Sequence, residues 1–211
     1  MRNEFRVFLF VLGLAGWAAP GYGQFLSLGG GALFSQDRSQ PAPDALTLGS
    51  LARSDFNRSG LIAVDAGLPV APFVNAGLHY SRSKPELFLR RGDAFGSSAR
   101  VKLAANTLTF DARLRSPFIY GFRLYGLAGV GFTRFGLEVK EAVEVPFPGG
   151  APDSVILAVV TYGGGVERRL RGLLHLKLEV RDYVSPIPDE LFGAGGSWHR
   201  VAVIGGIVLG L

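Results

Sequence analysis

The chain has 211 residues and a mass of 22.5 kDa, a length that suits one domain. Hydrophobic residues make up 48%, charged residues make up 18%, and there are 30 glycines. This composition is too apolar for a disordered chain and too rich in glycine for a helical bundle or a coiled coil. The chain has no cysteine, which excludes a disulfide scaffold, a zinc finger and a cysteine nucleophile.

The first 23 residues have the pattern of a signal peptide. Residues 1–6 are short and basic, residues 7–19 are apolar, and Gly21-Tyr22-Gly23 places small residues before a cleavage site at Gln24. The apolar stretch is shorter than the ~20 residues that a spanning helix needs. We therefore expect residues 1–23 to be a signal peptide and residues 24–211 to form an exported domain, with an N-terminal anchor as the alternative.

Eight segments follow in which apolar and polar residues alternate, the pattern of strands whose two faces meet different surroundings. In chain order they cover residues 25–35, 60–68, 73–83, 101–115, 123–137, 155–170, 174–184 and 201–211. The seventh is the clearest, because from residue 174 to residue 181 its even-numbered positions are leucine or valine and its odd-numbered positions are His175, Lys177, Glu179 and Arg181. We expect one face of the sheet to be apolar and the other to be polar along its whole length.

The connections between these segments alternate in length. Long ones cover residues 36–59, 84–100, 138–154 and 185–197, and short ones cover residues 69–72, 116–121 and 171–172. Long loops at one end, short turns at the other and an even number of strands are typical of outer-membrane barrels, in which closure also removes both sheet edges. The sequence thus predicts an all-β, eight-stranded antiparallel up-and-down transmembrane β-barrel, with the long loops at the cell surface carrying any specificity.

The polar face of these strands would line the lumen, and its charged residues are nearly balanced in sign. They are Asp65, Asp111, Arg113, Arg115, Glu167, Arg169, Lys177, Glu179 and Arg181. Because buried charges must be paired, we expect a charge network that plugs the lumen, with Glu167 and Lys177 as neighbours across the turn at Arg171-Gly172. A small, low-conductance pore that opens when these pairs rearrange is the alternative.

Four cations lie on the opposite, lipid-facing parity, at the long-loop ends of four strands. They are Arg58, Arg82, Lys102 and Arg134. Side chains at that height could extend to lipopolysaccharide phosphates, so we predict a lipopolysaccharide contact there. Ordinary solvated charges at strand ends are the alternative.

Three segments resemble the small outer-membrane β-barrel family typified by the OmpA barrel and OmpX: residues 162–170, residues 178–183 and the terminal strand. In that family the alternate apolar residues of the last strand are recognised by the barrel-assembly machinery. Val201, Val203, Ile207 and Leu209 fit that pattern, although the chain ends in Leu211 where the family usually has Phe or Trp. The resemblance implies a bacterial outer-membrane protein in contact with lipid and lipopolysaccharide. It also implies a structural or surface-interaction role, and we expect a monomer that could bind a surface ligand through its loops.

Ser197 and His199, with Asp189 or Glu190 in the preceding loop, are the residue types of a nucleophile, a base and an orienting acid. The lipid A deacylases, however, have His first and Ser two residues later on a lipid-facing strand. Here the order is reversed, and the two residues lie at the edge of a loop. We therefore expect no enzyme, and no catalytic residue, cofactor or metal.

Two binding functions from other classes, nucleic-acid binding and ligand transport by a soluble carrier, have less support in the sequence. The isoelectric point of about 9.8 suggests nucleic acid, but the basic residues alternate along strands and do not cluster with stacking aromatics, so we expect no nucleic-acid partner. A soluble lipocalin-like carrier would have the same strand count with an apolar interior. That arrangement would place the charges of the seventh segment outside and leave the glycine- and serine-rich face of the first segment unexplained.

Overall fold

A computed structural model describes residues 24–35, 51–56, 58–91, 98–139, 154–186 and 197–210 of the chain. The predicted signal peptide, residues 1–23, lies outside the described residues, as do Asp189, Glu190 and Leu211. No helix in the described ranges is long and apolar enough to cross a membrane.

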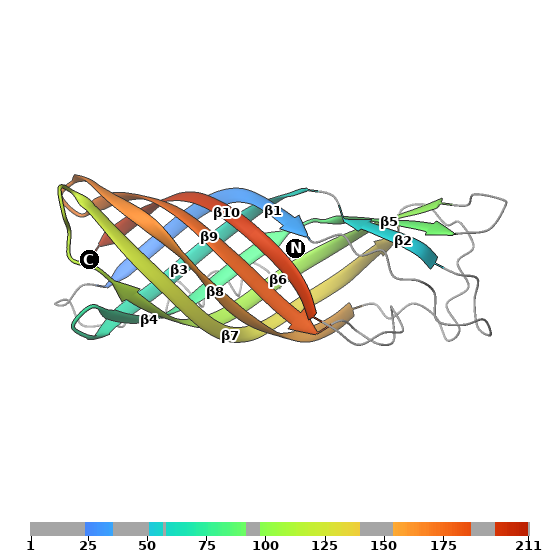
Figure 1. Cartoon of the computed structure of the whole chain (residues 1–211), viewed down its shortest axis with the longest axis horizontal. Coiled ribbons are helices and arrows are strands. Elements are labelled where there is room, and N and C mark those ends of the chain that lie inside the picture. The colour runs from blue at the N-terminus through green and yellow to red at the C-terminus, as the bar shows by residue number, and fades with distance from the viewer. Residues whose placement is uncertain are drawn as a thin grey trace, which may run out of the picture.

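Eight long strands form a closed antiparallel sheet (Figure 1). Each pairs with the next in the chain, and the last pairs with the first, so the predicted up-and-down barrel is confirmed. The barrel strands are β1 (Phe25–Ser35), β3 (Ser59–Ala71), β4 (Val74–Ser83), β6 (Ser98–Arg115), β7 (Phe122–Val139), β8 (Ser154–Arg171), β9 (Leu174–Pro186) and β10 (Ser197–Gly210).

Two further strands, β2 (Leu51–Phe56) and β5 (Glu86–Arg91), lie in segments that the sequence predicted to be loops. They pair with each other, and β5 pairs with the first part of β6, beyond the point where β4 ends opposite Ala105. Figure 1 shows them projecting from the long-loop end of the barrel. Each has only six residues, and a period of two over so short a segment is not distinctive.

The two faces of the barrel wall have the predicted orientation. Apolar side chains point outward along every barrel strand, with exposed fractions of 61% for Leu28, 64% for Ile62 and 56% for Phe110. Charged side chains point inward, where Asp65 is 1% exposed and Glu179 is 0% exposed. An apolar exterior around a charged interior fits lipid and is wrong for a soluble carrier.

Glycines in the strand interiors allow the strands to approach closely on the inner face of the barrel. A Cβ atom at Gly131 would overlap the carbonyl oxygen of Leu108, and one at Gly163 would overlap that of Val180. Both residues belong to paired strands, so the neighbouring backbone occupies the space that a side chain would need.

The short-turn end carries exposed aromatic residues. Phe73 is 57% exposed, Tyr120 is 97% exposed and Phe122 is 46% exposed. Aromatic residues at the rim of an apolar band are typical of the interfacial girdle of a membrane barrel.

Candidate functional site

Asp65 of β3 is the centre of a buried cluster in the lumen. Its Oδ1 accepts hydrogen bonds from His79 Nδ1 at 2.7 Å and Arg113 Nη2 at 2.5 Å. Its Oδ2 accepts from Ser27 Oγ at 2.7 Å and Lys177 Nζ at 2.5 Å. Four strands thus supply donors to one carboxylate, which stabilises its charged form and cross-links the barrel from inside.

A second part of this cluster lies around Arg181 of β9. Its Nη1 donates to Asp111 Oδ2 at 2.7 Å and its Nε donates to Glu179 Oε1 at 2.9 Å. Tyr125 Oη donates to the other oxygen of Glu179 at 2.8 Å. Arg181 and Glu179 are both fully buried, so this pairing compensates charges that water does not reach.

Glu167 binds two arginines of the lumen. Its Oε2 accepts two bonds from Arg123, at 2.6 and 3.0 Å, and Arg115 Nη2 lies 3.7 Å from Oε1. Lys177 is the backbone partner of Glu167 across the turn, as expected, but its ammonium contacts Asp65 and Glu179 instead. The two residues are neighbours across the turn, as predicted, but their side chains form no ion pair, because Arg123 binds Glu167 and the lysine side chain extends to Asp65 and Glu179.

Eight of the nine predicted lumen charges are buried, and Arg169 is the exception. It is exposed, because it lies near the end of β8 where the pairing with β9 shifts register between Arg169 and Arg171. Arg123 takes part in its place, with a side chain that is 18% exposed. The lumen has one half nearer the short turns and one nearer the long loops. We define the charged network as the four carboxylates, the five cations and the histidine that meet in the half nearer the short turns: Asp65, Asp111, Glu167, Glu179, Arg113, Arg115, Arg123, Lys177, Arg181 and His79.

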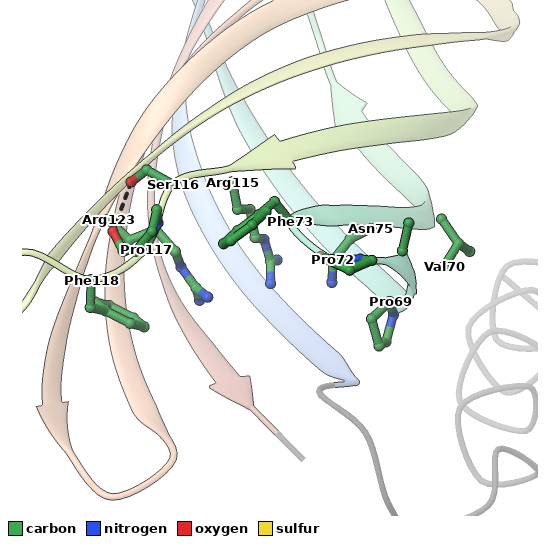
Figure 2. Close-up of a pocket in the computed structure, with 11 residues that line it drawn as sticks. Pro69, Val70, Pro72, Phe73, Asn75, Arg115, Ser116, Pro117, Phe118 and Arg123 are labelled. Carbon is green, nitrogen blue, oxygen red and sulfur yellow. Dashed lines mark hydrogen bonds between the residues drawn. The ribbon is translucent and has the colours of Figure 1, made fainter.

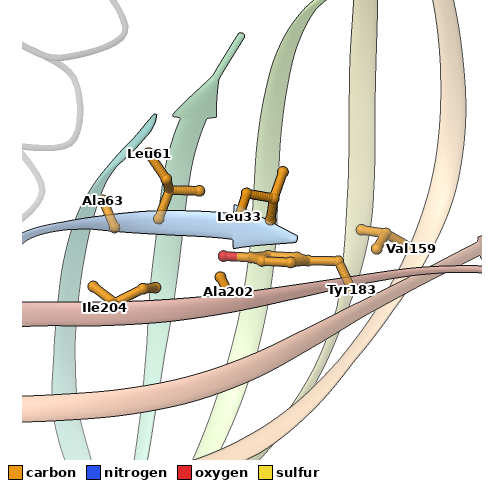
Figure 3. Close-up of a cluster of buried hydrophobic side chains, with 7 residues drawn as sticks. All are labelled: Leu33, Leu61, Ala63, Val159, Tyr183, Ala202 and Ile204. Atoms are coloured by element: carbon orange, nitrogen blue, oxygen red, sulfur yellow. The ribbon is translucent and has the colours of Figure 1, made fainter. Parts of the chain in front are cut away.

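The half of the lumen nearer the long loops contains a cluster of buried apolar side chains, beside buried hydroxyl groups such as those of Ser81, Thr107 and Thr133. We call this cluster the apolar plug: Leu33, Leu61, Ala63, Val159, Tyr183, Ala202 and Ile204. Figure 3 shows the ring of Tyr183 next to Leu33 and Ala202. These residues have inward parity, so the expectation that the inner face stays polar throughout is wrong for this half. Leu33 and Leu61, both on the inward parity, were the sequence signal for it.

Arg200 is a buried cation that the sequence analysis missed. It is 1% exposed, and its guanidinium carbon lies 5.0 to 5.7 Å from the ring centres of Phe135, Tyr183 and Trp198. Its Nη2 also donates to Thr133 Oγ1 at 3.0 Å. Aromatic faces therefore stabilise this charge in a part of the lumen where no carboxylate of the described residues forms an ion pair with it.

A hydrogen-bond contact between His79 and Tyr183 joins the charged network to the apolar plug. His79 Nε2 lies 2.7 Å from Tyr183 Oη, while Nδ1 of the same ring donates to the Asp65 carboxylate, which can only accept. A neutral imidazole that donates from Nδ1 accepts at Nε2, so the tyrosine hydroxyl donates to it.

A cavity of about 610 Å³ opens at the short-turn end. Figure 2 shows Arg115 and Arg123 among the side chains that line it, together with Phe73, Phe118 and Asn75. Because both arginines belong to the charged network, the cavity is a vestibule that ends at the network.

Asp65, His79 and Asp111 lie close enough to hold a metal ion, since one ligand atom of each falls within 4.8 Å of the others. Their carboxylate oxygens, however, already accept hydrogen bonds from Arg113, Lys177 and Arg181. Three neighbouring cations oppose a further positive charge, so the chemistry of this group favours ion pairing over metal binding.

The four outward cations are placed as follows. Arg58 and Arg134 are exposed, Arg82 is half-buried, and only the backbone of Lys102 is described. Arg82 and Arg134 both pair with Asn106 in the strand register, so they share one row across three strands. Lys102 lies four residues before Asn106 on β6, in the part of that strand that pairs with β5.

Ser197 and His199 lie side by side at the start of β10, on its outward parity. Ser197 Oγ lies 3.5 Å from His199 Nε2, and His199 Nδ1 lies 2.7 Å from Asp182 Oδ2 on β9. Tyr162 Oη on β8 donates to the same Asp182 oxygen at 2.9 Å. The acid beside His199 is thus Asp182, which the sequence analysis did not consider because it lies 17 positions earlier in the chain.

The closed eight-stranded sheet, its apolar exterior and its filled, charged lumen define a small outer-membrane β-barrel. No protein-family model and no curated protein sequence matches the chain. Among solved structures, it is similar to the outer-membrane protein OprG from Pseudomonas aeruginosa, with a TM-score of 0.61 and 16% identity over 90% of this chain and 96% of that one. It is also similar to Neisserial surface protein A, with a TM-score of 0.54 and 11% identity over 90% and 97% of the two chains. Neither name describes an enzyme, and at these identities the likeness extends to the fold alone.

Proposed function

We propose that the chain is a non-conducting outer-membrane barrel that holds its long loops at the cell surface, in a structural or surface-interaction role. The lumen takes no catalytic part in this role. After export and removal of residues 1–23, the protein would insert as a monomer through the barrel-assembly machinery.

The observation that carries this proposal is the presence of two closures in series along one lumen. An ion entering through the vestibule first meets the charged network, in which Asp65, Glu179 and Arg181 are at most 1% exposed. It then meets the apolar plug, where buried side chains such as Leu33 and Ile204 fill the lumen. Passage would require ion pairs to break and apolar side chains to move, and both steps are costly in a narrow barrel.

The test is conductance of the refolded protein in planar bilayers, with heat-modifiable gel migration of the same sample verifying a folded barrel. Electrical silence is the expected result. Steady openings of the unmodified protein would overturn the proposal in favour of the small pore.

Two pairs of substitutions show whether the closures act in series. Asp65→Ser with Lys177→Ser removes one ion pair of the charged network, and Leu33→Ala with Tyr183→Ala removes bulk from the apolar plug. Each pair alone should leave the barrel silent, and the combination should conduct. Conductance after opening the charged network alone would mean that the apolar plug does not close the lumen.

The proposal extends to lipopolysaccharide as the lipid partner of Arg58, Arg82, Lys102 and Arg134. What supports it is the exposure of Arg58 and Arg134 and the shared row of Arg82 and Arg134. Arg58→Ala with Arg134→Ala should weaken retention of lipopolysaccharide by the detergent-solubilised barrel in a pull-down. The control is Arg168→Ala, which removes an exposed cation near the short-turn end and should change nothing.

A further inference from the structure

A chain of polar contacts crosses three neighbouring strands on the lipid-facing side of the barrel. Asp182 accepts from Tyr162 Oη and contacts His199 Nδ1, and His199 Nε2 faces Ser197 Oγ. These residues point outward, since the alternate positions Arg181, Tyr183, Trp198 and Arg200 are buried in the lumen. The cluster is therefore separate from the charged network and from the apolar plug.

The order of these groups is that of an acid, a base and a nucleophile. A carboxylate beside Nδ1 accepts the ring proton there and leaves Nε2 as the acceptor, which is the tautomer that a general base needs. The Ser197–His199 distance of 3.5 Å is longer than a normal hydrogen bond, as is common in hydrolases without substrate. The geometry thus supplies the contact that orients the histidine and places the serine hydroxyl 3.5 Å from its Nε2.

Lipid alone does not account for a carboxylate on this face. An acidic side chain that faces the apolar band costs free energy unless polar neighbours compensate it. Asp182 has two such neighbours at Oδ2, and its Oδ1 is buried and accepts no hydrogen bond from the described residues. Asp182 contacts the imidazole and Tyr162 donates to Asp182, so both are positioning residues.

The surroundings indicate the class of substrate. Exposed apolar side chains lie beside the cluster on the same outward face, among them Val160, Val180 and Val201. In the strand register Asp182 pairs with Val201, and Val201 pairs with Phe34, whose ring lies 5.3 Å from the Arg58 guanidinium. An acyl chain would lie along the valines. A headgroup phosphate would lie near Arg58, two strand spacings or about 10 Å from Asp182.

We propose that Ser197 and His199, oriented by Asp182, hydrolyse a carboxylic ester between an acyl chain and the headgroup of an outer-leaflet lipid. Ser197 Oγ attacks the ester carbonyl carbon while His199 Nε2 takes the hydroxyl proton. The ester C–O bond then breaks, and the headgroup alcohol leaves with that proton. Water, deprotonated by His199, cleaves the acyl-serine, which releases a fatty acid and regenerates Ser197.

The experiment is release of fatty acid by the full barrel refolded into vesicles. One set of vesicles contains phospholipid alone, and a second contains phospholipid with lipopolysaccharide, so the two arms distinguish the source of the ester. Ser197→Ala and His199→Ala should each lower the rate by about 10³-fold or more, and Asp182→Asn should lower kcat with little change in KM. The matched control is Ser185→Ala, which alters a buried, inward-facing serine at the same height of the barrel. Heat-modifiable migration of every variant verifies folding.

A second readout does not depend on the choice of lipid. A fluorophosphonate probe reacts with serines that a neighbouring base activates, so it should label Ser197, as located by mass spectrometry. Labelling should be lost in His199→Ala and retained in Ser185→Ala. A folded barrel that takes no label and releases no fatty acid would overturn the proposal, as would hydrolysis that survives Ser197→Ala. Neither result depends on conductance, so the role proposed for the lumen is tested separately.

Discussion

The two halves of the lumen are built from the same strands, but ion pairs dominate one half, whereas the other contains an apolar cluster beside hydroxyl side chains. On β3, Asp65 belongs to the charged network, and Ala63, two residues away, belongs to the apolar plug. On β9, Arg181 and Tyr183 show the same change. Ion pairs hold the first half together, and packing of apolar side chains contributes to the second. The comparison shows that inward parity decides which residues enter the lumen, whereas height along the strand decides their chemistry.

Loss of a charge in the network should have the largest effect. Asp65→Ala leaves Lys177 and Arg113 without their closest carboxylate, and breaking a buried ion pair from one side costs about 3–5 kcal/mol. Urea unfolding of the refolded barrel, followed by tryptophan fluorescence, measures the change. Adding Lys177→Met should restore part of the loss. An unchanged unfolding midpoint for Asp65→Ala would mean that solvent already screens this cluster.

Loss of bulk in the apolar plug should cost less. Leu33→Ala removes a side chain that is 2% exposed, and we expect a loss of about 2–3 kcal/mol, in the lower part of the range for buried leucines. The control is Leu28→Ala on the same strand, which faces outward at 61% exposure and should matter less. If both variants unfold alike in urea, the lumen of this half is not packed.

The contact between the two halves should be worth less again. Tyr183→Phe keeps the ring in the apolar plug and removes the hydroxyl that donates to His79, a change of about 1 kcal/mol. The unfolding curve of Tyr183→Phe should lie between those of the unmodified protein and Leu33→Ala. A shift as large as that of Asp65→Ala would show that His79 depends on this tyrosine to hold the whole network together.

The smallest effect is expected for Arg169→Ala. Arg169 has inward parity but is exposed, so its loss should change stability by less than about 0.5 kcal/mol. Arg123→Ala is the comparison, because it removes both hydrogen bonds to buried Glu167 and should destabilise the barrel clearly. Equal effects of the two substitutions in urea unfolding would contradict the assignment of Arg123 to the charged network and of Arg169 to its outside.

The sequence by itself determined the barrel and the orientation of its wall. A period of two over ten or more residues decides which side chains share a face, and alternating loop lengths decide which end holds the short turns. Both are local properties, so they could be predicted from neighbouring residues. For the same reason Asp65, Arg113, Lys177 and Arg181 could be assigned to the lumen.

Only the tertiary structure decided which inward residues meet. Lys177 binds Asp65 across 112 positions of sequence, and Tyr183 contacts His79 across 104. Those partners depend on how the closed sheet staggers its strands, which no single strand encodes. The same stagger brings Asp182 to His199, and the register shift near the turn after β8 leaves Arg169 outside the network.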